Sequence, residues 1–162
     1  MGRYIRLVPV RRVAYEAEGW GTGELIFEDG LLAWHELPRE AFRNDVATEV
    51  DPLAKRMVAF LGGARDSFAD VELDLEWCTA FQRSALEAMR EIPYGETVTY
   101  GEVAALAGHL NAQRAVGSVC AQNRFGLVVP CHRVVAADGL GSYGSLGLGY
   151  KRRLLELEGV AV

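Results

Sequence analysis

The sequence lacks several features that mark particular classes of protein. It has only three cysteines, Cys78, Cys120 and Cys131, which are far apart and cannot all pair. This pattern argues against a disulfide framework, so we expect a cytoplasmic protein with at least one free thiol. No hydrophobic run approaches the roughly 18 residues that span a bilayer. The first residues also lack the apolar segment of a secretion signal.

The sequence also has no strong excess of positive charge. Its net charge is −5, from 17 basic and 22 acidic residues, which argues mildly against a nucleic-acid partner. The two halves differ, because residues 1–80 carry 9 basic and 15 acidic side chains, whereas residues 81–162 carry 8 and 7. Only the second half is suited to approach a polyanion. An ordinary acidic surface on one domain explains the same asymmetry.

The first half is predicted to consist mainly of strands. β-Branched, aromatic and alternating residues favour strands over residues 4–10, 13–18, 24–28 and 31–36. The Asp29-Gly30 dipeptide between the last two segments is a strong hairpin signal. A helix is expected over residues 52–61. Strict alternation over residues 70–75 predicts an edge strand.

The second half is predicted to be mainly helical. The hydrophobic period changes from 2 to 3.6 near residues 76–79, so we expect two domains, 1–76 and 77–162. Helices are expected over residues 81–92, after an N-cap at Thr99 with Glu102 completing a capping box, over 112–122 with Asn111 as cap, and over 149–157. The second and third of these helices meet at a turn with Gly108. That pattern is typical of a helix-turn-helix, but many helical hairpins share it.

The helix predicted over residues 112–122 has two dissimilar faces. One face is apolar and consists of Ala115, Val116, Val119 and Cys120. The other has one long cation among tiny side chains and consists of Arg114, Gly117, Ser118 and Ala121. Small side chains allow another surface to approach the helix backbone closely. That surface is either a nucleic-acid groove or the other domain.

The candidate chemistry centres on Cys131. A short buried strand over residues 127–129, ended by Pro130, is predicted to deliver this cysteine at its end. A thiol attacks as the thiolate, with an ordinary pKa of ~8.5, and a neighbouring imidazole such as His132 activates it by taking the proton. Glu158 falls inside the apolar arc of the last helix and is the natural carboxylate to orient that imidazole. A Cys-His dipeptide alone is more often structural.

Several segments together resemble the O6-alkylguanine-DNA alkyltransferases. They are Ile92-Pro-Tyr-Gly-Glu-Thr, Tyr100-Gly-Glu, Arg114-Ala-Val-Gly, Asn123 and the run Pro-Cys-His-Arg-Val-Val at 130–135, in the spacing of that family up to Glu158. They span roughly half of the chain. The resemblance implies an α+β protein of two domains. A strand-rich, RNase H-like α/β domain precedes an all-helical, winged-helix-like domain with the helix-turn-helix and the active-site cysteine.

The resemblance also implies catalytic roles. Cys131 is similar to the acceptor nucleophile, and His132 to the base that connects it through water to Glu158. Asn123 is similar to the hinge that joins the helix-turn-helix to the active-site loop. Tyr100 is similar to the residue that pushes the 3′ phosphate and donates a proton to guanine O6.

Contacts with DNA follow from the same resemblance. Arg114 is similar to the arginine that replaces an extruded nucleotide, while Ala115, Gly117 and Ser118 let the helix enter the minor groove. Arg124 stands where the family commonly has proline, and it is expected either to loosen the hinge or to add a phosphate contact. The substrate-binding residues implied are Pro130, Val134, Tyr143, Gly144 and Ser145. The loop over residues 142–149 departs from the family's usual form.

The resemblance implies a DNA-repair enzyme that acts once. It would irreversibly transfer an alkyl group from O6 of guanine, and from O4 of thymine, to Cys131, as a methylated-DNA–[protein]-cysteine S-methyltransferase. We expect a monomer that binds double-stranded DNA, flips the base, needs no cofactor or metal and contacts no membrane. One alternative is a sensor that binds flipped O6-alkylguanine and recruits other repair factors. Another is a helix-turn-helix regulator that senses alkylation or oxidation through Cys131.

Overall fold

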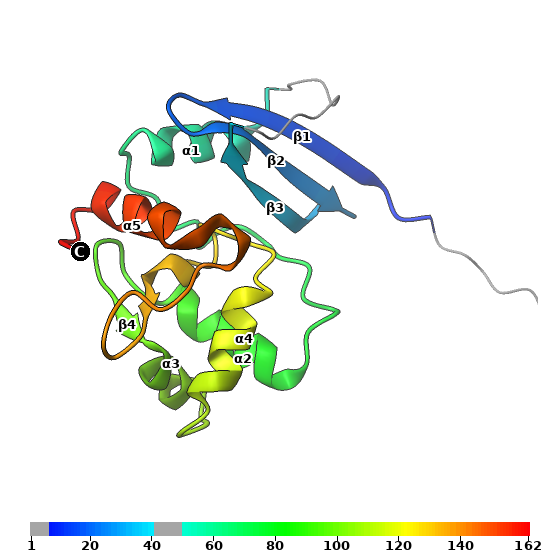
Figure 1. Cartoon of the computed structure of the whole chain (residues 1–162). Coiled ribbons are helices and arrows are strands. Elements are labelled where there is room, and N and C mark those ends of the chain that lie inside the picture. Colours follow the sequence, from blue (N-terminus) through cyan, green and yellow to red (C-terminus); the bar gives the residue numbers. More distant parts are fainter. Residues whose placement is uncertain (1–6, 41–49) are drawn as a thin grey trace, which may run out of the picture.

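The computed structural model describes residues 7–40 and 50–162, and its first half contains a three-stranded antiparallel sheet in the order β1-β2-β3 (Figure 1). We call this sheet the N-terminal sheet. Its strands are β1 (Val10–Ala17), β2 (Gly21–Glu28) and β3 (Leu31–Arg39). Asp29 and Gly30 have φ of 52° and 79°, the two positive values that a type I′ hairpin turn requires. The predicted hairpin is therefore confirmed.

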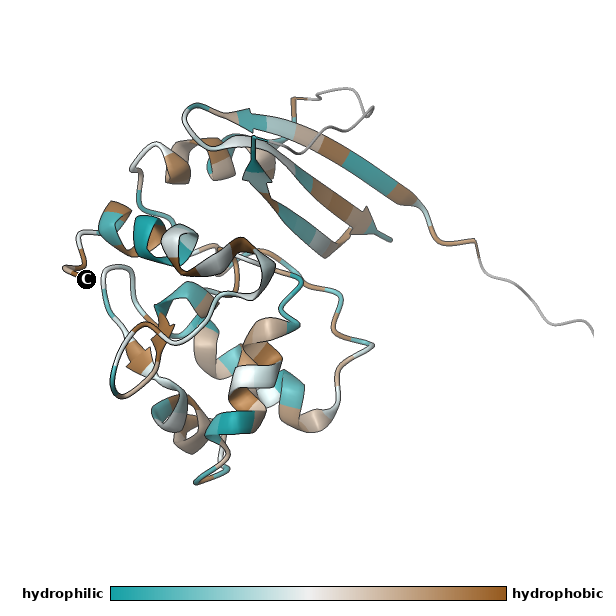
Figure 2. Ribbon diagram, viewed as in Figure 1, coloured by the Kyte–Doolittle hydropathy of each residue, from teal (hydrophilic) through white to brown (hydrophobic). Residues whose placement is uncertain are grey.

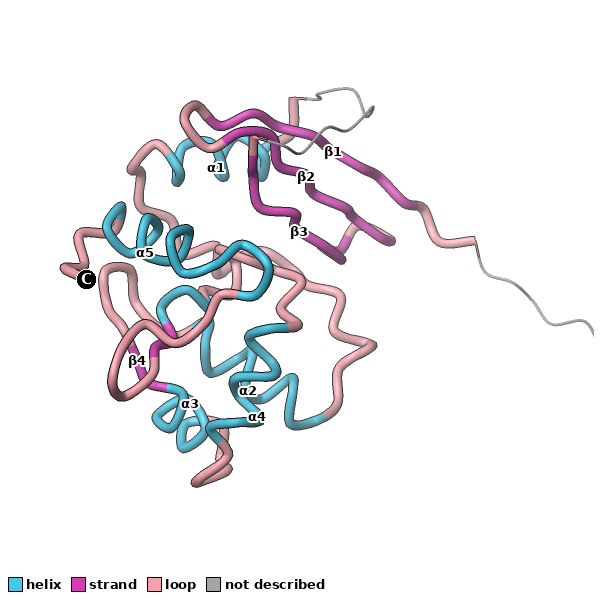
Figure 3. The backbone as a smooth tube through the Cα atoms, in the orientation of Figure 1, coloured by secondary structure: helices cyan, strands magenta, loops and turns pink. Residues whose placement is uncertain are grey.

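The second half is helical apart from one very short strand pair. Its elements are α2 (Ala80–Arg90), β4 (Val98–Thr99), α3 (Tyr100–Leu106), α4 (Gln113–Ala121), η1 (Cys131–Arg133), β5 (Val134–Val135), η2 (Gly144–Leu146) and α5 (Gly147–Leu157). β4 and β5 pair in parallel. A long stretch without α-helix, which contains the short 3₁₀ helices η1 and η2, separates α4 from α5 (Figure 3). α5 returns to lie between the N-terminal sheet, with α1 (Pro52–Leu61) beside it, and the helices α2, α3 and α4 (Figure 1).

The predicted helices lie within two residues of their expected bounds, because local signals determine them. α1 (Pro52–Leu61) begins after Asp51, whose carboxylate accepts hydrogen bonds from two backbone N–H groups of the first turn. Thr99 caps α3 as predicted and accepts a hydrogen bond from the N–H of Glu102 at 3.1 Å. The predicted cap at Asn111 is wrong. Ala112 occupies the N-cap of α4 without a side-chain hydrogen bond, and Asn111 has a φ of 63°.

Three strand predictions need correction. Residues 70–75 form no strand and make only a bridge from Leu73 to Leu32, because the chain turns away on either side of that contact. Residues 127–129 also form no strand, since Leu127 has a φ of 73° and turns the chain. The segments 4–10 and 13–18 were expected to be separate, but one continuous edge strand, β1, starts at Val10. Residues 4–6 lie outside the described residues.

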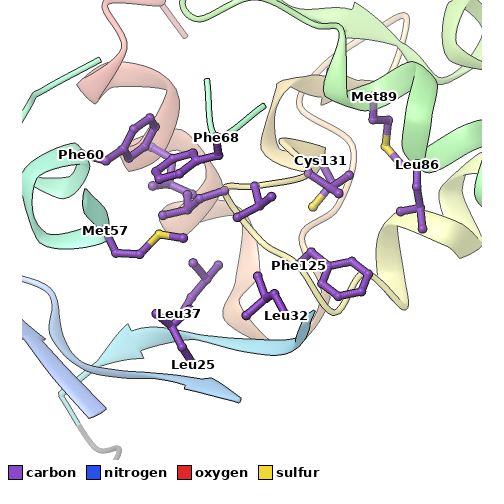
Figure 4. Close-up of a cluster of buried hydrophobic side chains, with 14 of the residues drawn as sticks. Leu25, Leu32, Leu37, Met57, Phe60, Phe68, Leu86, Met89, Phe125 and Cys131 are labelled. Carbon is purple, nitrogen blue, oxygen red and sulfur yellow. The ribbon is translucent and has the colours of Figure 1, made fainter. Parts of the chain in front are cut away.

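A single hydrophobic core connects the N-terminal sheet to the helices. Figure 2 shows hydrophobic and hydrophilic residues alternating along the strands, which gives the sheet one face to bury. Figure 4 shows side chains of this core from several elements: Leu25, Leu32 and Leu37 from the sheet, Met57 and Phe60 from α1, Leu86 and Met89 from α2, Phe68 and Phe125 from loops, and Cys131 from η1. Cys131 therefore lies between the two halves of the chain. No helix in the described ranges is long and apolar enough to cross a membrane.

Candidate active site

Cys131 opens the short turn η1 at the inner end of the segment 123–129, which we call the active-site loop. Its side chain is 7% exposed and belongs to the core. The backbone N–H of Cys131 donates to the carbonyl of Val129 at 2.8 Å, which tightens the turn. Pro130, directly before it, is also buried. The sulfur is thus held at a fixed place with little contact to bulk water.

Asn123 fastens the active-site loop and touches the sulfur directly. Its Nδ2 donates to Cys131 Sγ at 3.1 Å and to the carbonyl of Val129 at 3.0 Å. Its Oδ1 accepts from the N–H of Phe125 at 2.9 Å. Sequence comparison indicated only a hinge at this position. The structure adds the direct contact between Asn123 and the sulfur. The sequence could not show it, because this contact depends on how the segment between Asn123 and Cys131 folds.

His132 and Glu158 are brought together as predicted. His132 Nε2 lies 2.5 Å from Glu158 Oε2, and both side chains are fully buried. Arg133 donates to both oxygens of the same carboxylate, at 2.8 and 3.1 Å, and the N–H of Gly95 donates to Oε1 at 2.9 Å. Sequence analysis gave Arg133 no role. The signal was available, since a carboxylate in an apolar arc needs a cationic partner and Arg133 directly follows His132.

The electrostatics of this cluster favour a neutral imidazole beside a charged carboxylate. Burial alone would raise the pKa of Glu158, but hydrogen bonds from His132 and Arg133 outweigh it and lower the pKa to about 2. Burial lowers the pKa of His132. Because a carboxylate only accepts, the proton of the neutral imidazole lies on Nε2. His132 Nδ1 is then an acceptor, and it is buried with no hydrogen-bond partner among the described residues.

Burial acts against ionisation of the thiol in the free protein. Burial raises the pKa of Cys131, although the Asn123 hydrogen bond and the nearby Lys151 cation both oppose this effect. The neutral thiol is a weak nucleophile. A base must therefore remove the proton when the sulfur reacts. The Nδ1 of His132, the next residue along the chain, is unpartnered within the described ranges and is the candidate acceptor.

Lys151 is a buried cation that sequence analysis missed. Its Nζ donates to the carbonyls of Val134 at 2.6 Å and Ser142 at 3.1 Å, and it lies 5.6 Å from the centre of the Tyr100 ring. Burial lowers the pKa of Lys151. Helical spacing could have indicated its position, because it stands three and four residues before Leu154 and Leu155 on the face of α5 that is buried.

A cavity of about 220 Å³ lies beside Cys131. Of the residues expected to bind substrate, Tyr143, Gly144 and Ser145 line it, whereas Pro130 and Val134 do not. Tyr100 does not line it either. The binding roles of these residues stay predictions. The hydroxyl of Tyr143 is buried and faces the thiol of Cys131. The opposite wall was not expected from the sequence, because it comes from β3 of the N-terminal sheet: Trp34, His35, Glu36, Leu37 and Arg39.

The exposed face of α4 has the small residues that its pattern predicted. Arg114 and Ser118 are exposed, and a Cβ added at Gly117 would meet no atom within 4 Å. Val116 and Val119 are buried, as expected for the apolar face. Ala115 was placed on that apolar face, but it is exposed. Another surface therefore has unobstructed access to this side of the helix.

Arg124 lies between two tryptophans. Its guanidinium carbon is 4.0 Å from the centre of the Trp77 ring and 5.2 Å from that of Trp34. These contacts join the active-site loop to β3 and to the segment before α2. The predicted phosphate contact of Arg124 stays a prediction.

The fold and site define a class of protein with two features. One is a buried cysteine that is followed in sequence by the histidine of a buried imidazole–carboxylate pair. The other is a pair of short helices, α3 and α4, of which α4 has an exposed face with small residues. The described residues contain no group of three His, Cys, Asp or Glu side chains that could hold a metal ion.

Comparison with known proteins places the chain in one family. A model of the DNA-binding domain of 6-O-methylguanine DNA methyltransferase matches residues 80–160. A methylated-DNA–protein-cysteine methyltransferase from Methanopyrus kandleri is 43% identical over 122 residues, which are 75% of this chain and 86% of the relative. A variant of the Mycobacterium tuberculosis O6-methylguanine methyltransferase has a TM-score of 0.74 and 35% identity over 93% of each chain. Mycobacterium tuberculosis OGT in complex with DNA has a TM-score of 0.68 and 34% identity, covering 91% of this chain and 92% of that one. The chain therefore belongs to the 6-O-methylguanine DNA methyltransferase family.

Proposed function

We propose that this protein repairs DNA by transferring an alkyl group from O6 of guanine to Cys131, once per molecule. The observation that carries the proposal is the arrangement around the sulfur. Asn123 holds Cys131 beside a cavity, and the pair His132–Glu158 has one unpartnered imidazole nitrogen. A soft nucleophile with a dedicated proton acceptor suits attack on an alkyl carbon. Curated relatives named methylated-DNA–protein-cysteine methyltransferase support the same reaction.

The transfer balances with residues of this chain and one water. The thiol proton passes through one water to Nδ1 of His132, and Glu158 stabilises the imidazolium that forms. The sulfur attacks the alkyl carbon in line, so an S–C bond forms while the C–O6 bond breaks. The electron pair of the broken bond stays on O6, and Tyr100 donates a proton there. Proton return from the imidazolium restores Tyr100. The thioether has no easy hydrolysis route, so the protein is consumed.

The approach to DNA uses the open face of α4. We infer that α4 enters the minor groove of duplex DNA, where Ala115, Gly117 and Ser118 allow close contact, and that the alkylated base is flipped into the cavity. Arg114 fills the gap in the base stack, while Arg124 contacts a phosphate. An alkyl group on O4 of thymine would reach the sulfur in the same way. Support comes from the exposure of these α4 residues and from a similar chain solved with DNA.

Replacing Arg114 with alanine is expected to weaken binding to duplex DNA that carries O6-methylguanine by about tenfold, because an empty gap in the stack costs roughly 1.4 kcal/mol of the flipping energy. Fluorescence anisotropy at fixed salt measures this change. Lys55→Ala is the matched control, since it removes one exposed cation from α1 on the far side of the core. Binding to a single strand, which has no gap to fill, should change little in Arg114→Ala. An equal loss on both DNA forms would contradict the role of Arg114.

We also propose that residues 1–76 and 77–162 are two domains, the first RNase H-like and the second winged-helix-like. Two features support the division. All three strands of the N-terminal sheet precede residue 76, and four of the five α-helices found in residues 7–40 and 50–162 follow it. We further propose that the protein acts as a monomer.

The function is tested by incubating the protein with duplex DNA that contains O6-methylguanine and measuring its intact mass. We expect a gain of one methyl group, located on the peptide with Cys131, and no gain with unmodified duplex. Tight binding of the lesion without transfer would instead support a lesion sensor. Binding confined to a defined DNA sequence would support a regulator.

A further inference from the structure

The active-site loop is attached to the edge of the N-terminal sheet at two points, both made by His35 of β3. The backbone N–H of His35 donates to the carbonyl of Arg124 at 2.7 Å. Its ring Nδ1 lies 2.6 Å from the carbonyl oxygen of Gly126. Residues 124–126 therefore continue the sheet beyond β3 as a single parallel bridge between His35 and Phe125.

The other ring nitrogen of His35, Nε2, is bonded by a residue of β1, the strand at the opposite edge of the sheet. Tyr15 of β1 places its hydroxyl 2.5 Å from His35 Nε2, and both side chains are buried. Burial lowers the pKa of His35 to about 4, so the ring is neutral at neutral pH. A carbonyl only accepts, so Nδ1 carries the proton toward Gly126 and Nε2 accepts from the Tyr15 hydroxyl. Both ring nitrogens are thus committed to fixed bonds.

Two glycines make this arrangement sterically feasible. Gly23 pairs with Tyr15 between β1 and β2, and a Cβ at residue 23 would lie 2.5 Å from the tyrosine ring. The Tyr15 ring can cross over β2 toward His35 because Gly23 has no side chain. At the other end, a Cβ at Gly126 would lie 3.0 Å from Leu37 of β3. A bare backbone is therefore needed where the loop meets the sheet.

The same loop residues lead to the sulfur. Phe125 lies between Arg124 and Gly126, whose carbonyls bond to His35. The N–H of Phe125 donates to Asn123 Oδ1 at 2.9 Å. The amide of Asn123 in turn donates to Cys131 Sγ at 3.1 Å. A continuous path of hydrogen bonds and loop backbone thus joins β1 to the thiol, and the bonded residues His35 and Gly126 are 91 positions apart in sequence.

We propose that Tyr15 and His35 are positioning residues for alkyl transfer, through which the N-terminal sheet fixes the active-site loop and thereby the Asn123–Cys131 contact. The proposal rests on the proposed function of Cys131. It gives the first half of the chain a role in the reaction, although that half contains no catalytic group. A hydrogen bond to the sulfur stabilises the thiolate form, so loss of this alignment weakens both orientation and acidity of the thiol.

The test compares two properties of Cys131 in the full-length protein. One is the rate of alkyl transfer from duplex DNA. The other needs no DNA and is the rate of modification by iodoacetamide across a pH series, followed by mass spectrometry on the Cys131 peptide. The thiol of Cys131 also interacts electrostatically with Lys151, Tyr143 and Cys120. These three residues are therefore left unchanged in every variant.

His35→Leu removes both side-chain bonds and should slow transfer about tenfold, with the pH profile of Cys131 moved to higher pH. His35→Asn, which keeps a donor near Nδ1, should recover most of both properties. Tyr15→Phe keeps the aromatic ring and should show a smaller change in the same direction. This variant tests the proposal if His35→Leu does not fold. Arg153→Ala is the matched control, because it removes another contact to the N-terminal sheet, the bond to the Gly19 carbonyl.

Three results would overturn the proposal. They are an unchanged profile and rate in the folded His35 and Tyr15 variants, a profile that moves to lower pH, and equal changes in Arg153→Ala. If the unmodified protein transfers no alkyl group while the profile shifts as described, the proposed function fails, and what stands is that Tyr15 and His35 position the Cys131 thiol.

Discussion

Replacing Cys131 with serine is expected to abolish alkyl transfer, lowering its rate by more than about 10³-fold. A serine hydroxyl is far less acidic and less polarisable than a thiol, and the neutral imidazole of His132 cannot ionise it to a useful extent. The substitution is nearly isosteric and the Asn123 amide still finds an acceptor, so we expect the fold to survive. Intact mass after incubation with O6-methylguanine duplex is the measurement, and no added methyl group should be found.

Cys78→Ser is the matched control for this prediction. Cys78 is half-buried in the segment before α2 and does not line the cavity, so this variant should gain one methyl group like the unmodified protein. DNA binding gives a second comparison, since Cys131→Ser should bind the alkylated duplex with nearly unchanged affinity. Methyl transfer by Cys131→Ser at the normal rate would refute the assignment of the acceptor.

Burial affects two groups of the site in ways that suit the proposed reaction. It raises the pKa of Cys131, which favours the protonated and less nucleophilic thiol in the free protein. It lowers the pKa of His132, which favours a neutral imidazole that can accept a proton. In the proposed single reaction this arrangement is useful, because a permanently ionised thiolate would be lost to unrelated electrophiles.

The parts of the site that lie on local motifs could be predicted from the sequence. Cys131 and His132 are adjacent, and helical spacing placed Glu158 on the buried face of the last helix. The Asp29-Gly30 hairpin and the Thr99 cap were found for the same reason, since each is determined by neighbouring residues.

Features that depend on distant parts of the chain could not be predicted. The partners of His35 are Tyr15, which is 20 residues away, and Gly126, which is 91 residues away. Only the docking of the N-terminal sheet brings them together. The segment 70–75 shows the converse, because its alternating pattern fits a strand but only Leu73 reaches the sheet edge. Tertiary contacts therefore decide whether a segment with a strand-like pattern actually forms a strand.

The largest effect on stability is expected from Glu158→Gln. The carboxylate of Glu158 is the counter-ion of the Arg133 guanidinium, whose side chain is only 5% exposed. It also accepts a hydrogen bond from the buried imidazole of His132. Removing the charge leaves the Arg133 guanidinium buried without its counter-ion, which costs about 3–5 kcal/mol of unfolding free energy. The free energy of unfolding from urea titrations measures this loss. Glu156→Gln is the matched control, because it is the same substitution on the exposed side of α5.

The same variant tests the pH dependence of stability. The folded pKa of Glu158 is about 2, below its ordinary value of 4.5, so its contribution is present above about pH 4.5 and is lost as the pH falls toward 2. Between about pH 7 and pH 3 the unmodified protein should lose about 2 kcal/mol more than Glu158→Gln does. Alkyl transfer by the folded variant at neutral pH should also fall by about 100-fold, since the imidazolium of His132 loses its anion. Parallel stability curves for the two proteins would show that the carboxylate is not charged in the fold, and the proton path through His132 would then need another acid.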